Sequence, residues 1–192
     1  MADAVRLGIV GCGGIAGAHL NGYEKLAAEG YDRFAITAVC DVNADGAKAF
    51  ADRVEANLGA RPRVFATADE MVAAGAADAA DICLPHAFHH TAGVACLRGG
   101  VHIMVEKPVG ITVKATRRMM EAAEGTDLII AGAEQIRRCI GARAIEWAIN
   151  DQRMFGDPLF FTQEVFSGSP FDRSDYKFAW RSLKVMGGGG QI

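Results

Sequence analysis

The sequence predicts an α/β protein built on a doubly wound parallel sheet, followed by the start of a smaller α+β unit. Two observations lead to this fold class. Short apolar runs alternate with longer helical patterns through the first two thirds of the chain, which is typical of βαβ units. A glycine-rich turn also follows the first apolar run and opens the first helical pattern.

The apolar runs are short enough to be buried strands, and the segments between them carry helical periodicity. Each crossover between neighbouring parallel strands is expected to be right-handed. The predicted strands are 5–10, 34–40, a weaker one at 63–66, 80–84, 101–105 and 127–132. The predicted helices include 14–29, 44–58, 87–98 and 112–124.

The pattern changes near residue 133. Ile136, Ile140, Ala144 and Trp147 predict a helix over 136–150 with one apolar face. "FGDP" then indicates a turn, and "LFFTQEVFSG" reads as a strand of a different kind. We therefore assign 1–132 to one domain and 133–192 to the N-terminal part of a second, which is thin for an independent core.

Composition excludes several classes of function. The net charge is −3 and no basic stripe is present, which argues against a nucleic-acid partner. No apolar stretch approaches the roughly 18 residues of a membrane helix, so no membrane span is expected. The cysteines form no CxxC pair, which favours reduced thiols in a cytoplasmic protein. They are Cys12, Cys40, Cys83, Cys96 and Cys139.

The glycine-rich turn has the pattern G-x-G-x-x-A between a strand and a helix, as in a Rossmann-type dinucleotide site. Its first glycine allows a tight turn, its second lets a pyrophosphate approach the backbone, and the small third residue lets helix and strand pack closely. The phosphates would lie at the helix N-terminus. The predicted cofactor-binding residues here are Gly11, Gly13, Gly14, Ile15 and Ala16.

Asp41 closes the next predicted strand, "FAITAVCD". Its carboxylate would accept hydrogen bonds from the adenosine ribose and repel a 2′-phosphate. Arg33 and Arg53 are not adjacent to it in sequence, so NAD is favoured and NADP is not excluded. The alternative is that Asp41 is only a turn or N-cap residue.

Two further stretches follow later strands, where ligands bind in open α/β sheets. In "CLPHAFHH", Pro85 ends a strand, and His86 and His89 lie on one side of a helix start. Together with His90 they permit a metal interpretation, but their spacing fits no standard zinc motif, and we predict no metal. Capping or cofactor contact is favoured instead.

In "HIMVEKPVG", an apolar strand runs directly into Glu106, Lys107 and Pro108. A charged pair at this point is either a solvated strand end or a placed catalytic group. The proline ends the strand and suits a cis peptide bond that aims Lys107 inward.

These motifs together resemble the Gfo/Idh/MocA family of oxidoreductases over essentially the whole chain. The glycine turn, Asp41 and "LPHAFH" (for the family's TPNxxH) support the resemblance, and "GGVHIMVEKPVGIT" is its most specific part. Arg137 in "EQIRR", "FGDP" and "WRSLKVMGGGG" match later family motifs. The resemblance implies an NAD(P)-dependent dehydrogenase that acts on a sugar-like or polyol substrate and assembles into a homo-oligomer.

The resemblance also implies roles for individual residues. Lys107 would contact the substrate hydroxyl and the nicotinamide ribose, and its ammonium would stabilise a developing alkoxide. Leu84 and His86 replace the usual Thr and Asn, which puts their polar contacts in doubt. The other implied cofactor neighbours are Leu84, Pro85, His86 and His89 at the nicotinamide half, Glu106 and Gln135 at the ribose, and Trp180 and Arg181 as a cover from the second domain.

The glycine run of "KVMGGGGQI" ends the chain where the family's catalytic helix begins. That helix normally supplies an aspartate and a proton-transferring histidine, and Lys107 by itself leaves proton transfer unsupported. We therefore expect a fragment that binds NAD(H) without oxidising a sugar. A flexible tail, a non-catalytic dinucleotide-binding module, and a generic Rossmann domain are the alternatives; the EKP segment argues against the last.

Overall fold

The computed structural model describes residues 4–160, 162, 164, 180 and 183–187. The chain divides into two compact units, residues 1–133 with 180–192 and residues 134–179. The predicted strand that starts at 159 lies largely outside the described residues; 159, 160, 162 and 164 are not in a strand.

The first unit is a six-stranded sheet in the order β3-β2-β1-β4-β5-β6, and all its strand pairs are parallel. The chain adds strands outward from β1 in one direction and then returns to add β4 to β6 in the other, so the topological switch point lies between β1 and β4. The strands are Val5–Val10 (β1), Phe34–Cys40 (β2), Arg63–Phe65 (β3), Ala79–Ile82 (β4), His102–Glu106 (β5) and Ile130–Ala133 (β6).

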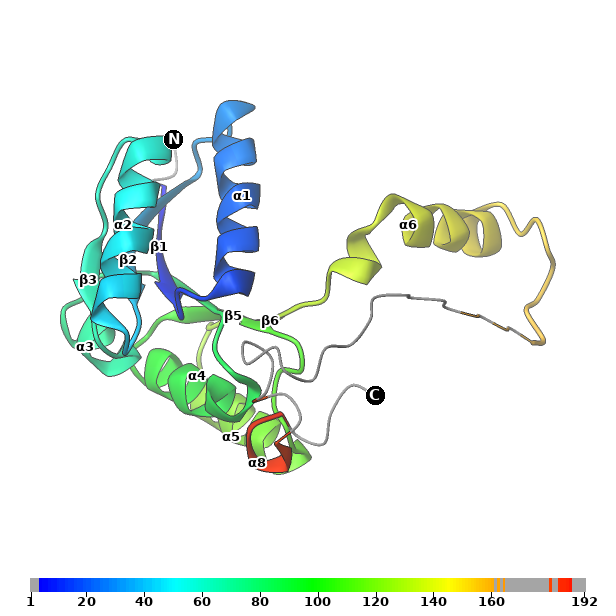
Figure 1. Cartoon of the computed structure of the whole chain (residues 1–192). Coiled ribbons are helices and arrows are strands. Elements are labelled where there is room, and N and C mark those ends of the chain that lie inside the picture. The colour runs from blue at the N-terminus through cyan, green and yellow to red at the C-terminus, as the bar shows by residue number, and fades with distance from the viewer. Residues whose placement is uncertain (1–3, 161, 163, 165–179, 181–182, 188–192) are drawn as a thin grey trace. The chain divides into compact units, whose positions relative to one another are not determined.

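Helices cover both faces of this sheet (Figure 1). One buried cluster lies under α1 and α2, and the other lies under α3, α4 and α5. Helix α3 has no counterpart among the predicted helices, because it is too short to show helical periodicity, and the short 3₁₀ helix η1 overlaps the start of the predicted helix 87–98. The bounds are Gly14–Ala28 (α1), Ala44–Leu58 (α2), Ala68–Ala73 (α3), His86–Phe88 (η1), His89–Arg98 (α4) and Val113–Ala123 (α5).

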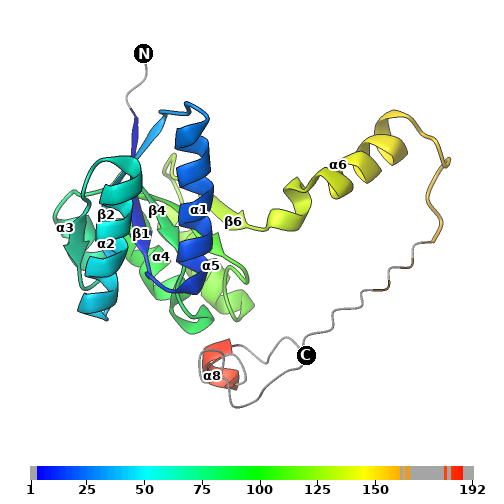
Figure 2. The ribbon, with the colours of Figure 1, turned by 45° about the horizontal axis from the view of Figure 1, so that its top comes forward.

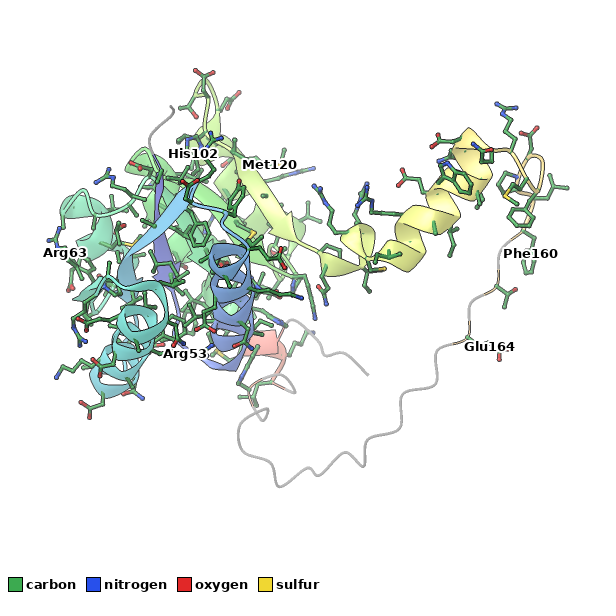
Figure 3. All side chains as sticks on the ribbon, turned by 90° about the horizontal axis from the view of Figure 1, so that it is seen from above. Arg53, Arg63, His102, Met120, Phe160 and Glu164 are labelled. Atoms are coloured by element: carbon green, nitrogen blue, oxygen red, sulfur yellow. The ribbon has the colours of Figure 1, made fainter. Side chains whose placement is uncertain are left out.

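Helices α1 and α2 lie alongside each other (Figure 2) and are joined by an ion pair. Arg53, labelled in Figure 3, extends from α2, and its Nη2 lies 2.8 Å from Glu24 Oε2 on α1. Asn43 caps the start of α2 and Thr112 caps the start of α5, and the side chain of each accepts a backbone N–H. The ion pair thus joins α1 to α2.

The second unit contains a run of helical turns of three kinds. The predicted helix at 136–150 is α-helical only at Ile140–Glu146 (α6); it is preceded by a 3₁₀ turn at Gln135–Arg138 (η2) and followed by a π-helical turn at Trp147–Asp151 (η3). None of these elements contains a buried residue. A last short helix, Lys184–Gly187 (α8), belongs to the first unit, and the glycines after it lie outside the described residues.

Candidate functional site

The glycine turn after β1 is shaped by its surroundings. Gly11 has φ +93°, and a Cβ there would lie 2.6 Å from the Cys83 carbonyl oxygen, so only glycine fits. Ala16 is fully buried against the sheet, which is the close packing that a small residue allows. The predicted reasons for the first glycine and for the alanine therefore match the structure.

The turn leaves the start of α1 open. A Cβ on Gly13 or Gly14 would meet no atom within 4 Å, and Gly13 precedes the helix without a side-chain hydrogen bond to cap it. The first backbone N–H groups of a helix have no partner inside the helix and attract anions. This end of α1 can therefore receive phosphate oxygens.

Asp41 lies directly beside the turn. Its Oδ2 accepts the backbone N–H of Cys12 and its Oδ1 accepts that of Asn43, both at 2.8 Å. Asn43, not Asp41, caps α2. Each carboxylate oxygen keeps a further lone pair, so Asp41 can brace the turn and still accept a ribose hydroxyl.

A cleft of about 500 Å³ opens at this edge of the sheet. The cleft is lined by the turn, the end of β2, the loop after β3 and the end of β4, including Gly11, Gly13, Asp41, Thr67, Leu84 and Pro85. It therefore brings together five of the predicted residues at the switch point, where open α/β sheets bind ligands.

The thiol of Cys12 in the glycine turn is neutral. Burial and the nearby charge of Asp41 raise the pKa of Cys12 to about 12.

A wider hollow of about 990 Å³ lies among α3, α4 and α5. Charged side chains such as Asp69, Arg98 and Arg118 line it, and none of the predicted site residues does. Because it lies over the helices and not at the strand ends, we do not take it as the cofactor site.

His89 is fully buried and holds two loops together. Its Nε2 lies 2.7 Å from the Leu84 carbonyl oxygen and its Nδ1 lies 2.8 Å from that of Pro108. Both ring nitrogens are thus used by backbone carbonyls, which leaves neither for a metal ion. His89 therefore joins the loops that follow β4 and β5, and its place beside the cofactor stays a prediction.

Glu106 is the last residue of β5 and Lys107 follows it, and the Lys107–Pro108 peptide bond is cis, as the sequence predicts. Glu106 is largely buried, and its Oε2 accepts the Lys107 N–H at 3.1 Å. Its Oε1 lies 3.1 Å from Nε2 of His19 on α1. Both oxygens therefore have partners within the protein, in addition to the ribose contact predicted for Glu106.

The remaining predicted residues are spread over the chain. The His86 ring meets the Trp180 ring edge-on, with 4.8 Å between centroids, and its Nδ1 lies 3.3 Å from the Gly187 carbonyl oxygen. Ile15 is exposed on α1. Gln135 and Arg137 lie in η2, an element of the second unit. Arg181 lies outside the described residues.

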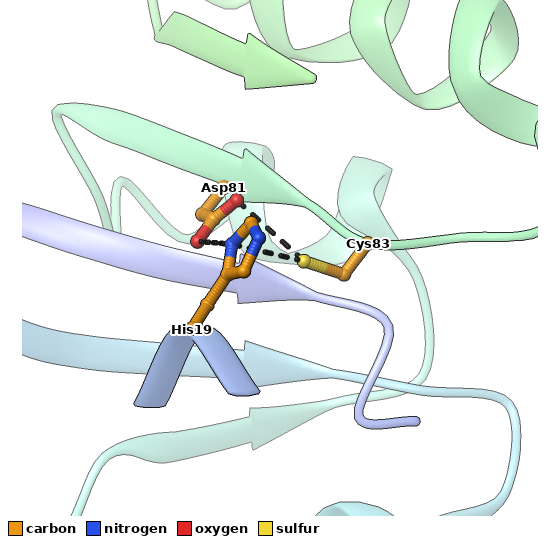
Figure 4. Close-up of side chains that lie close together, drawn as sticks. All are labelled: His19, Asp81 and Cys83. Carbon is orange, nitrogen blue, oxygen red and sulfur yellow. Dashed lines mark hydrogen bonds and ion pairs between the residues drawn. The ribbon is translucent and has the colours of Figure 1, made fainter. Parts of the chain in front are cut away.

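A polar cluster that the sequence analysis did not name lies between α1 and the sheet (Figure 4). His19 Nδ1 is 2.8 Å from Asp81 Oδ2, and the Cys83 sulfur is 3.5 Å from the same nitrogen. The ligand-type atoms of these three residues lie within 4.8 Å of one another. Because hydrogen bonds already join them, we describe them as a hydrogen-bonded network. A charged residue inside the apolar run "ADICL" was the available signal for it.

Comparison with known proteins places this geometry in a family. Residues 5–133 match the model of the Gfo/Idh/MocA family, described as an oxidoreductase family with an NAD-binding Rossmann fold. This agrees with the predicted fold class, the predicted cofactor NAD and the resemblance drawn from the motifs.

Among the residues that the structure describes, no helix has both the length and the apolar character needed to cross a membrane.

Three individual proteins illustrate the similarity. The chain is 30% identical over 158 residues to an inositol 2-dehydrogenase/D-chiro-inositol 3-dehydrogenase of Shouchella clausii, covering 81% of this chain and 42% of that protein. It is 31% identical over 126 residues to a glycosyl hydrolase family 109 protein of Streptomyces coelicolor, covering 64% and 26%. The WlbA dehydrogenase of Bordetella pertussis, solved with NADH and UDP-GlcNAcA, is 28% identical with a TM-score of 0.68, covering 81% and 43%. The chain thus spans less than half the length of each.

Proposed function

The chain belongs to the Gfo/Idh/MocA oxidoreductase family, and on that premise we propose that its glycine turn and Asp41 bind NAD for hydride transfer. The substrate class is a sugar-like or polyol molecule, whose alcohol or carbonyl carbon would exchange a hydride with the nicotinamide. The observation that carries the proposal is the uncapped start of α1, which opens beside the cleft at the β1/β4 switch point.

Different residues contact the adenosine and nicotinamide ends of the cofactor. The N–H groups at the start of α1 bind the pyrophosphate, and Asp41 accepts the adenosine ribose hydroxyls. The Asp41 carboxylate disfavours a 2′-phosphate by repulsion, so NAD is preferred over NADP. Leu84, Pro85 and His86 border the nicotinamide half, with Gln135, Trp180 and Arg181 as further neighbours.

Lys107 supplies the charge at the reacting end. Its ammonium group stabilises the alkoxide that develops on a substrate hydroxyl as hydride leaves the carbon. We also propose that residues 133–192 begin a second, substrate-binding domain, and that the full protein is a cytoplasmic homo-oligomer. The five free cysteines are consistent with a reducing compartment.

A matched pair of glycine variants tests the cofactor site. In Gly13→Val the new side chain would enter the space where the pyrophosphate binds, so NADH affinity should fall by at least about tenfold while the melting temperature stays near that of the wild type. Gly22→Val places the same side chain elsewhere on α1, at a position where an added Cβ would meet no atom within 4 Å. This variant should bind NADH as the wild type does. Fluorescence titration of NADH measures both.

The same titration with NADPH tests the role of Asp41. The wild type should bind NADH more tightly than NADPH, and Asp41→Ala should reduce that difference because the repelling carboxylate is removed. Equal NADH affinity in the wild type and Gly13→Val would refute the phosphate site. Equal affinity of the wild type for the two cofactors would refute the role of Asp41.

A further inference from the structure

Asp81 is a carboxylate buried in the middle of the sheet. It lies on β4 between Ile9 of β1 and Met104 of β5, and its side chain is 0% exposed. A buried charge is costly unless hydrogen bonds and an opposite charge compensate it. A charged residue at this place therefore needs partners, and α1 provides them.

His19 bridges two carboxylates. Its Nδ1 lies 2.8 Å from Asp81 Oδ2 and its Nε2 lies 3.1 Å from Glu106 Oε1. An ionised carboxylate only accepts hydrogen bonds, and the histidine ring donates from both nitrogens only as imidazolium. The hydrogen bond to Asp81 raises the pKa of His19; burial lowers it, and the charge of Asp81 and the contact with Glu106 raise it further.

The other groups of this network are neutral donors. Tyr23, one turn further along α1, donates its hydroxyl to Asp81 Oδ2 at 2.9 Å, and the Cys83 thiol lies 3.6 Å from Asp81 Oδ1. Burial raises the pKa of both groups, so they keep their protons. Among the described residues, the charges that meet His19 are thus the carboxylates of Asp81 and Glu106.

The Glu106 carboxylate links His19 to the backbone of Lys107. One oxygen of its carboxylate contacts His19 and the other accepts the Lys107 backbone N–H at 3.1 Å. Helix α1 begins at the glycine turn, and the loop after β5 begins at Lys107. A single histidine therefore connects the helix that starts at the phosphate site with the residue assigned to the reacting end.

We propose that His19 is a positioning residue, an imidazolium held between Asp81 and Glu106 that fixes the Glu106 carboxylate and through it the backbone of Lys107. The inference rests on the proposed function, because that function places Lys107 at the reacting end of the cofactor. Asp81 is the buried anchor of this network, and Tyr23 and Cys83 complete the hydrogen bonds of Asp81.

The protonation of His19 can be measured in the wild-type chain. Nitrogen-15 spectra of the imidazole rings, with His19 assigned by its absence in His19→Gln, should show both ring nitrogens protonated near neutral pH. A neutral tautomer with one unprotonated nitrogen would overturn the proposal. Glu106→Gln should lower the pH at which the ring loses its proton, and an unchanged titration in that variant would overturn it as well.

Hydrogen exchange at the Lys107 amide tests the positioning step. His19→Gln removes the charged partner of Glu106, so exchange at Lys107 should accelerate by about tenfold or more relative to amides of β1. Tyr23→Phe is the matched control: it removes a hydrogen bond to Asp81 but leaves the His19–Glu106 contact, and Lys107 exchange should stay within about twofold. Unaltered Lys107 exchange in His19→Gln contradicts the proposal.

Two ligands separate this inference from the proposed function. His19→Gln should weaken NADH binding by at least about threefold and leave ADP, which lacks both nicotinamide and its ribose, within about twofold of the wild type. If the wild type binds neither ligand, the proposed function fails, while the ring spectra and the exchange at Lys107 still decide the role of His19. If NADH binds equally well to both proteins, the positioning role of His19 fails by itself.

Discussion

The two units of this chain carry similar apolar patterns but bury them very differently. In the first unit, residues of the strands and one face of each covering helix form two buried clusters, and β1 and β2 contribute different residues to each. In the second, α6 and its flanking turns contain no buried residue, and Ile140 is 87% exposed. Phe160, labelled in Figure 3, is 88% exposed in the same unit.

The comparison shows that an amphipathic pattern predicts a helix without telling whether it has a core to pack on. The first unit supplies both faces of its sheet with helices from its own sequence. The second unit has an apolar helix face and, within the described residues, no buried cluster beneath it. We therefore expect the first unit to contribute most of the free energy of unfolding of the chain.

Substitutions at a matched pair of isoleucines should give the largest difference in the free energy of unfolding. Ile82→Ala removes a fully buried side chain from β4 and should lower the free energy of unfolding by about 3 kcal/mol. Ile140→Ala removes the same atoms from an exposed position and should change it by less than about 0.5 kcal/mol. Urea denaturation followed by circular dichroism measures both. A similar loss of unfolding free energy in the two variants would contradict the expected difference between the units.

Two glycines with positive φ form the next pair. Gly11→Ala forces an L residue to φ +93° and brings its Cβ against the Cys83 carbonyl, which should cost about 2 kcal/mol or more. Gly156 has φ +70° in the second unit, and a methyl group added there would meet no atom within 4 Å, so Gly156→Ala should leave the main unfolding transition unchanged. Thermal denaturation of the two variants decides this, and equal melting temperatures would contradict it.

The pH dependence of the folding stability should show the smallest effect. All five histidines lie in the first unit, and the pKa of His19 is raised in the folded protein. The folded state therefore holds a proton that the unfolded chain releases near the ordinary histidine pKa of about 6.5. The stabilisation by His19 is complete below that value and is lost as the pH rises through the folded pKa.

Urea unfolding between about pH 6 and about pH 9 measures this slope. The difference in stability between the wild type and His19→Gln should be largest at the acidic end and shrink as the pH rises. A difference that grows with pH would show that the folded state prefers the neutral ring.

Much of the first unit could be predicted because its signals are local. The six strands and the helices α1, α2, α4 and α5 appear at their predicted places, with ends shifted by a few residues, such as β6 at Ile130–Ala133 against 127–132. Helix α3 was missed because its six residues are too short for a period to show. The glycine turn and Asp41 were found because a strand, a turn and a helix follow one another within one short segment.

The sequence by itself determined the βαβ order, the turn that only Gly11 can make, and the acid that follows β2. These follow from backbone sterics and from the spacing of apolar residues, which act over a few positions. The tertiary structure alone decided that His19, Asp81 and Glu106 meet, and that His89 lies behind two loops. Those contacts depend on β4 pairing with both β1 and β5 and on where α1 crosses them, and the energetic need to compensate a buried carboxylate then selects the partners.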